Sequence, residues 1–129
     1  MKKLLLALVL ACAPVFSFAQ SMGTFAVEAK PVDQYYRYNF GNVTVGMRMF
    51  ADFTLTAPAN EAVQVKGITI SGAMYDAQSN CPVVLNPGLT CTTRVFFWPR
   101  LEGGAWGSLV FNLQDHRIII DLFGYGWRR

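Results

Sequence analysis

Hydrophobic and polar residues alternate with a period of two along much of the chain. The clearest example is MRMFADFTLTA, in which the residues on one side are mostly apolar: Met47, Met49, Ala51, Phe53 and Leu55. The intervening residues are mostly polar: Arg48, Asp52, Thr54 and Thr56, with Phe50 as the exception. Successive side chains of a β-strand point to opposite faces, so this segment is predicted to be a strand with one buried face.

Six further segments are predicted as strands, and Gly, Pro and Asn separate them. They are TFAVEA (24–29), AVQVKGITISG (62–72), a short piece near AMYD (73–76), TTRVFFW (92–98), WGSLVFNL (106–113) and RIIIDLFG (117–124). In the second of these the alternation slips at Gly67, which predicts a β-bulge. No segment has convincing helical periodicity. About seven short strands predict an all-β fold, a single immunoglobulin-like antiparallel β-sandwich of two sheets.

The amino-terminal residues have the features of a secretory signal peptide. Met1, Lys2 and Lys3 form a basic start, an apolar run follows from Leu4 to Cys12, and small residues at Ser17 and Ala19 suit a signal peptidase. We therefore predict a signal peptide over residues 1–19 with cleavage after Ala19, and a secreted or periplasmic protein. A lipoprotein signal ending at Cys12 is the alternative. The remaining chain is predicted to comprise an amino-terminal segment (20–37) with a possible first strand, and the sandwich domain (38–129).

Charge adds little to the prediction of partners. Two of the 11 Lys and Arg residues lie in the predicted signal peptide, which leaves nine basic against eight acidic side chains. A domain so close to neutral lacks the basic character of a nucleic-acid-binding protein. After the signal peptide no apolar run approaches the roughly 20 residues of a transmembrane helix.

Several short motifs resemble a known family. They are NFGNVTVG (39–46), ISG (70–72), CPVVLNPGLTC (81–91), VFFWP (95–99), GGAWGSLVF (103–111) and LFGYG (122–126). In this order they are similar to the Hydin-like or ASH immunoglobulin-like domain, the choice-of-anchor D type of secreted bacterial proteins. The resemblance covers about residues 38–126. The matching positions are Phe40, Gly41, Gly46, Pro87, Gly88, Phe97, Pro99, Leu122, Gly124 and Gly126.

The resemblance implies an immunoglobulin-like fold with a binding or scaffolding role and no catalytic residues. The motif residues also have physical interpretations of their own. Gly41 and Gly46 suit a backbone path with positive φ, and Pro87-Gly88 suits the centre of a type II turn. Gly124 and Gly126 are expected to end the last strand at places where a Cβ atom does not fit.

Cys81 and Cys91 are the only cysteines outside the predicted signal peptide. Their spacing is not that of a Cys-x-x-Cys redox centre, and two cysteines with a single histidine do not complete a zinc site. In an oxidising compartment, and with a turn at Pro87-Gly88 folding the chain back between them, they are predicted to form a structural disulfide.

No residue pattern points to catalysis. His116, the only histidine, lies in a predicted turn, and we interpret it as a solvated turn residue. The serines lie in no nucleophile motif, and the aspartates are not spaced as a calcium loop. The chain is therefore predicted not to be an enzyme and to need no cofactor or metal.

Strict alternation predicts an unusual set of outward apolar side chains. If Val95 and Phe97 are buried, the residues opposite them and opposite the buried positions of the last two strands face outward: Phe96, Trp98, Trp106, Ile119 and Phe123. Either residues 20–38 cover these side chains, or they form a partner-binding face.

The sequence leaves two functions open. The first is a module that binds or organises another envelope or secreted protein, through this face or through an edge strand. The second is a carbohydrate-binding module that stacks sugar rings on Trp98, Trp106 or Trp127.

Overall fold

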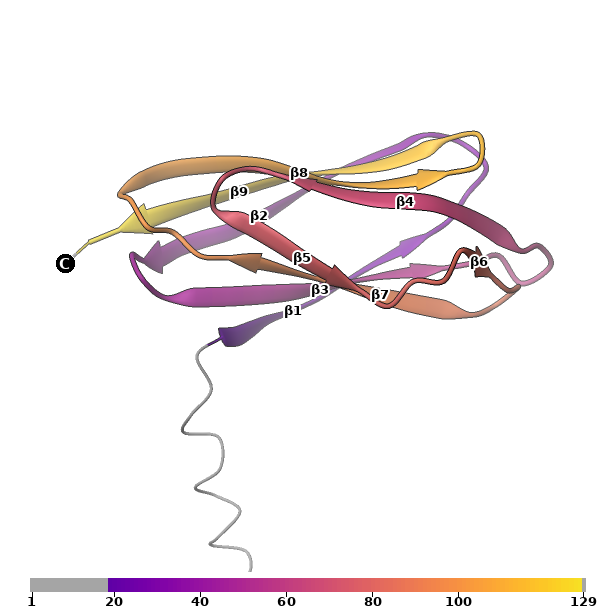
Figure 1. Ribbon diagram of the computed structural model, residues 1–129, viewed down its shortest axis with the longest axis horizontal. Coiled ribbons are helices and arrows are strands. Elements are labelled where there is room, and N and C mark those ends of the chain that lie inside the picture. The colour runs from indigo at the N-terminus through magenta and orange to yellow at the C-terminus, as the bar shows by residue number, and fades with distance from the viewer. Residues whose placement is uncertain (1–18, 129) are drawn as a thin grey trace, which may run out of the picture.

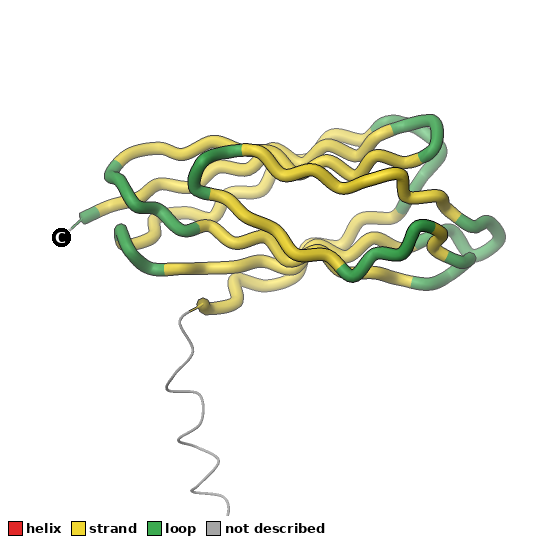
Figure 2. The backbone as a smooth tube through the Cα atoms, viewed as in Figure 1, coloured by secondary structure: helices red, strands yellow, loops and turns green. Residues whose placement is uncertain are grey.

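The computed structural model describes residues 19–128, which form nine β-strands and no helix (Figure 2). The strands are β1 (Ala19–Glu28), β2 (Gln34–Thr44), β3 (Arg48–Thr56), β4 (Val63–Ser71), β5 (Tyr75–Ser79), β6 (Val84–Leu85), β7 (Thr90–Phe97), β8 (Gly103–Leu113) and β9 (Arg117–Trp127). Of the predicted signal peptide only Ala19 is described, and Cys12 lies outside the described residues. The described part contains no helix with the length and apolarity to cross a membrane.

The strands form two stacked sheets (Figure 1). One sheet has four strands in the order β1-β3-β7-β5, and the other has five in the order β2-β9-β8-β4-β6. This arrangement confirms the predicted all-β, immunoglobulin-like sandwich. All seven predicted strands are present, and β2 and β6 bring the number to nine. Most neighbouring strands run antiparallel, and the two edge strands are the exceptions, because β1 runs parallel to β3 and β2 runs parallel to β9.

Residues 20–37 are part of the sandwich and not a separate segment. The expected first strand is β1, which pairs with β3 along its whole length, and β2 runs across the predicted boundary between residues 37 and 38. The ring of Phe25 on β1 lies 5.5 Å from that of Tyr36 and 6.1 Å from that of Tyr38, both on β2. These aromatic contacts join the two edge strands and close one side of the sandwich.

The core lies between the sheets and follows the predicted alternation. In β3 the side chains of Ala51, Phe53 and Leu55 are buried while the residues between them are partly exposed. The register of β4 against β8 shifts between Val65 and Gly67, which confirms the bulge. The largest fully buried side chains come from both sheets: Phe40, Phe53, Phe97, Phe111, Leu55, Leu85, Leu109, Ile118, Ile120 and Leu122.

Several motif residues meet at one point of this core. The ring of Phe97 lies 5.0 Å from that of Tyr75 and 5.5 Å from that of Phe40. On its other side it lies against Gly124, where a Cβ atom would be 2.4 Å from Phe97 Cε2. At Gly126 a Cβ atom would be 2.5 Å from a backbone oxygen. The expectation that no Cβ fits at these glycines is confirmed, but both lie within β9, so the expectation that they end the strand is wrong.

The other motif glycines lie at turns and bulges. Gly41, with φ of 77°, lies in a bulge of β2, and Gly46, with φ of 93°, lies in the turn from β2 to β3. Gly88 also has a positive φ, 77°, and Leu89 N–H donates to Asn86 O at 3.0 Å across Pro87-Gly88. This geometry is that of the predicted type II turn.

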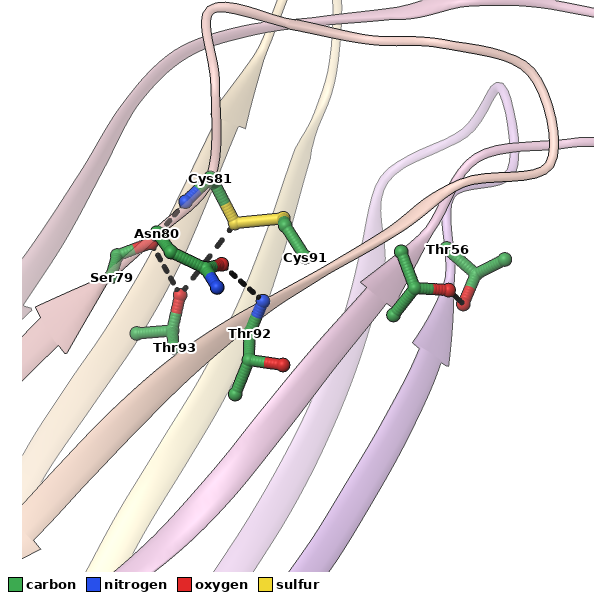
Figure 3. The surroundings of a disulfide bond; sticks show 8 residues. Thr56, Ser79, Asn80, Cys81, Cys91, Thr92 and Thr93 are labelled. Atoms are coloured by element: carbon green, nitrogen blue, oxygen red, sulfur yellow. Dashed lines mark hydrogen bonds between the residues drawn. A yellow bond between two sulfur atoms is a disulfide. The ribbon is translucent and has the colours of Figure 1, made fainter.

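The predicted disulfide joins Cys81 to Cys91, with their Cα atoms 4.9 Å apart (Figure 3). Cys91 lies on β7 and Cys81 follows the neighbouring strand β5. The chain between them leaves the four-stranded sheet, contributes β6 to the other sheet and returns. The disulfide therefore joins the two ends of the segment that crosses to the other sheet. Beside it Thr93 Oγ1, fully buried, donates to Ser79 Oγ at 2.9 Å.

The contact between Phe97 and Gly124 yields a first prediction. We expect Gly124→Ala to lower the free energy of unfolding by about 2–3 kcal/mol, because the added methyl group overpacks the core against a fully buried ring. Gly67→Ala is the matched control, since a Cβ at that position meets no atom within 4 Å. Equal denaturation midpoints for the two variants would show that the sheets do not approach as closely as described.

A second prediction concerns the disulfide. Alkylation and mass spectrometry of the native protein should find no free thiol at Cys81 or Cys91. Replacing both cysteines by serine should lower the free energy of unfolding by about 2–3 kcal/mol, because the closed loop restricts the unfolded chain. Alkylation of either thiol in unreduced, folded protein would refute the pairing.

Candidate functional site

The structure does not bring the five residues of the predicted binding face together. Phe96 and Trp98 lie on the outside of the four-stranded sheet, whereas Trp106, Ile119 and Phe123 lie on the outside of the five-stranded sheet. Alternation correctly predicts which side chains of a strand point outward, but it does not assign the strand to a sheet. The chain changes sheets between β7 and β8, so the predicted single face is two opposite faces.

Residues 20–38 cover neither face, because they form the edge strands β1 and β2. Their outward and inward side chains differ sharply in exposure. Tyr36 and Tyr38 pack against the core, while Tyr35 points outward and is 69% exposed. The amino-terminal strands therefore extend the outer surface instead of hiding it.

The outside of the five-stranded sheet carries most of the exposed aromatic side chains, and we call it the aromatic face. Its apolar members are Tyr35 on β2, Trp106 and Val110 on β8, and Ile119, Phe123, Tyr125 and Trp127 on β9. Trp106 is 70% exposed and pairs across the strands with Phe123, the two ring centroids lying 4.3 Å apart. Ile119 is flanked by Tyr35 on one side and Val110 on the other.

The outside of the four-stranded sheet has a different chemistry, in which arginines lie over aromatic rings. We call this group the arginine ladder: Arg48, Phe50, Arg94, Phe96, Trp98 and Arg100. The Cζ atom of Arg94 lies 4.0 Å from the ring centroid of Phe50, and that of Arg48 lies 4.2 Å from the ring centroid of Phe96. Trp98 has the guanidinium groups of both Arg48 and Arg100 near its ring, at 5.7 and 5.3 Å.

The ladder ends at a bidentate ion pair. Arg94 Nε donates to one oxygen of the Asp52 carboxylate at 2.8 Å, and its terminal nitrogen donates to the other at 3.2 Å. The hydrogen bonds to Asp52 raise the pKa of the Arg94 guanidinium. Sequence reasoning missed these arginines as a group, although the signal was present. Arg94, Phe96, Trp98 and Arg100 recur at every second position, as do Arg48, Phe50 and Asp52.

His116 is not the solvated residue that its place in a turn predicts, because its side chain is only 13% exposed. Its Nδ1 lies 3.0 Å from Asp115 Oδ1, and its Nε2 is buried without a hydrogen-bond partner among residues 19–128. The side chain lines a small pocket at one end of the sandwich with Lys30, Glu61 and Gln114, and no serine or cysteine lines that pocket. The arrangement thus lacks the nucleophile that an acyl-transfer site would require.

Residues 19–128 contain no group of three or more His, Cys, Asp and Glu side chains arranged to hold a metal ion. The strongest perturbation of a titratable group is at Tyr75, where burial raises the pKa far above its usual range. The Tyr75 hydroxyl donates to Ala105 O at 2.9 Å, which ties β5 to β8 across the two sheets. This tyrosine is a structural residue of the core.

Comparison with known proteins gives matches in structure alone. No protein-family model matches the chain, and no curated protein matches its sequence. The VesB protease of Vibrio cholerae matches at 19% identity with a TM-score of 0.58, over 70% of this chain and 30% of the protease. A family 123 glycoside hydrolase of Clostridium perfringens matches at 10% identity and a TM-score of 0.53, over 73% of this chain and 23% of the hydrolase.

A third match covers most of the other protein's length. The ASH/PapD-like domain 7 of human CEP192 is 13% identical, with a TM-score of 0.51, over 74% of this chain and 84% of that domain. The chain thus spans under a third of the two enzymes but nearly the whole of this domain. At these identities the matches show the fold alone, which is an immunoglobulin-like β-sandwich.

The buried tyrosines yield a prediction for alkaline pH. Burial raises the pKa values of Tyr75 and Tyr38 in the folded protein, while in the unfolded chain both ionise near pH ~10. These tyrosines therefore leave the free energy of unfolding unchanged below this pH. Above it they lower the free energy of unfolding, by at most about 1.4 kcal/mol per pH unit for each tyrosine. Tyr75→Phe should make the decrease shallower in denaturant titrations between about pH 8 and 11. An unchanged slope would show that Tyr75 is accessible to solvent.

Proposed function

We propose that the chain is a secreted or periplasmic, non-enzymatic immunoglobulin-like module that binds another protein of the cell envelope through the aromatic face. The observation that carries this proposal is the exposure of Trp106 and Tyr35, each beside further apolar side chains, on the outside of one sheet. Arg37, Asp121 and Ser108 form a polar row between the two groups. Tryptophan and tyrosine are enriched in protein interfaces, because each buries a large area at a small cost in side-chain entropy. An exposed apolar patch of this kind is a feature of interaction sites.

Three further observations support the proposal. The disulfide between Cys81 and Cys91 suits an oxidising compartment, in agreement with the predicted signal peptide. The motif residues resemble the choice-of-anchor D type of ASH domain, and we assign the chain to that type on this basis. Of the three matches described above, the ASH domain is the one that this chain spans over most of its length, whereas it matches only a small part of each enzyme.

The free edges of the sheets are less suited to a partner strand than the faces are. On β5, Ala77 N–H donates to the neighbouring Asp76 carboxylate at 2.9 Å. Two further edges, β1 and β2, are interrupted by bulges, and in the bulge of β2 Gly41 N–H donates to Asn39 Oδ1. The fourth edge, β6, is a strand of only 2 residues. Such devices discourage pairing between edge strands. We therefore place the partner on a sheet face.

Photo-crosslinking in the native host tests the proposal. A benzophenone side chain in place of Trp106 or Tyr35 should form adducts with one and the same envelope protein. The same probe in place of Leu89, which is exposed in the turn before β7, is the control and should not form that adduct. With purified partner, Trp106→Ala should weaken binding by at least about tenfold, whereas Leu89→Ala should leave it nearly unchanged. No adduct above the Leu89 background would contradict the proposal.

Carbohydrate binding is the second candidate, and the exposed ring of Trp106 is the observation that favours it. Trp98 is a poorer platform for a sugar, because two arginines flank its ring. If sugar stacking is the function, the protein should be retained on an insoluble polysaccharide and Trp106→Ala should abolish retention. The absence of retention for the wild-type protein would leave the protein-binding function.

A further inference from the structure

The arginine ladder is a second, chemically distinct surface, on the sheet opposite the aromatic face. Its members come from neighbouring strands: Arg48 and Phe50 from β3, and Arg94 and Phe96 from β7, with Trp98 and Arg100 just beyond. The register places Phe50 opposite Phe96, so the two rings pack at 5.8 Å. The two strands thus present guanidinium groups and rings in alternate rows.

Arginine side chains lie over or beside the rings of this surface, of which Trp98 is the most accessible, at 42% exposed. Phe96 is only 7% exposed, and Arg48 lies over it. Stacking of this kind restricts the arginine side chain. A restricted guanidinium loses less entropy when it forms the two parallel hydrogen bonds of an arginine–carboxylate pair.

Two of the three arginines have no carboxylate partner among residues 19–128. Arg94 is paired with Asp52, whereas Arg48 and Arg100 take part in no ion pair. Arg100 donates one N–H to Ala73 O at 2.7 Å and keeps further donors available. Asp76 is the acidic residue that lines the same hollow as these two arginines, and one of its carboxylate oxygens accepts the Ala77 N–H.

Arg48, Asp76, Trp98 and Arg100 line a shallow hollow of about 270 Å³, with Phe96 at its side. The hollow thus contains the guanidinium groups of Arg48 and Arg100, with the indole ring of Trp98 near both of them. It also contains the Asp76 carboxylate, which already accepts a backbone N–H. Excess positive charge with an apolar wall suits the carboxylate and methylene groups of Glu or Asp. Along a strand, residues on one face repeat at about 6.8 Å, which is also the repeat of alternate side chains in an extended peptide.

We propose that the arginine ladder binds an extended acidic segment of a protein partner, with Arg48 and Arg100 holding its carboxylates beside Trp98. This goes beyond the proposed function, because the ladder and the aromatic face lie on opposite sheets. A chain with both surfaces can hold two partners at once. The one exposed ring of this surface, that of Trp98, has the guanidinium groups of Arg48 and Arg100 close to it. This arrangement is unfavourable for stacking a sugar, so an acidic polysaccharide is the less suitable ligand.

The test uses fluorescein-labelled peptides and the complete mature protein. A peptide of alternating Glu and Ser should bind with a Kd below about 1 mM at low salt, and the affinity should fall as salt is raised. The matched peptide with Gln in place of Glu should not bind. The double variant Arg48→Gln/Arg100→Gln should lose at least about tenfold in affinity, and the corresponding Lys double variant should recover part of it.

Two control variants test whether the arginine ladder itself holds the peptide. Arg37→Gln removes an exposed positive charge from the other sheet and should change the affinity less than about twofold, which excludes a general charge effect. Trp106→Ala should leave peptide binding unchanged, so failure of the aromatic face and failure of the ladder are distinguishable. Thermal unfolding of each variant verifies that it is folded.

Three outcomes would overturn the inference. They are equal binding of the Gln peptide, no binding of the Glu peptide by wild-type protein, and binding of an alginate oligomer in preference to the Glu peptide.

Discussion

The close approach of the two sheets at Phe97 is the constraint on which the rest of the structure depends. Phe97 on β7 lies against the backbone of Gly124 on β9. Any side chain at position 124 larger than the hydrogen of glycine would overlap the Phe97 ring. With this contact in place, the rings of Phe40 and Tyr75 fill the space around Phe97. Phe40, Phe97 and Gly124, which are far apart in the sequence, thus meet at one packing site.

The same contact determines what the outside of the molecule carries. Because Phe97 points inward, its neighbours Phe96 and Trp98 point outward on the four-stranded sheet. Because Gly124 faces the core, Phe123 and Tyr125 point outward on the five-stranded sheet. The two outer surfaces therefore follow from a single register, and their chemistry differs. One surface is aromatic and exposed, whereas on the other Arg48 and Arg94 lie over the rings of Phe96 and Phe50, and Trp98 remains partly exposed.

Local rules predicted much of the fold. The alternation in β3, the bulge at Gly67, the turn at Pro87-Gly88 and the disulfide could all be inferred from residues close together in the chain. The strand β2 was missed, although its inward residues Tyr36, Tyr38 and Phe40 recur at every second position. The outward Tyr35 is also aromatic, which weakens the contrast between the two faces of this strand.

The candidate site was harder to predict, because it depends on which sheet each strand joins. Nothing in the alternation of β7 and β8 shows that Trp98 and Trp106 end on opposite sides of the molecule. That separation comes from the loop between the strands, which carries the chain across the sandwich. The arginine ladder was hidden for a related reason. Its cation–π contacts join β3 to β7, which are paired in space although the contacting residues lie 44 and 48 positions apart in sequence.

Both proposed surfaces require that this sandwich binds with its sheet faces, and not with a strand edge or an end of the sandwich. Backbone amide chemical shifts of the isotope-labelled protein, followed while the crosslinked envelope protein is added, locate the bound surface residue by residue. We expect changes concentrated on the outward residues of β8 and β9, around Trp106 and Phe123. Changes confined to β5 or to the His116 end of the sandwich would contradict binding by the aromatic face.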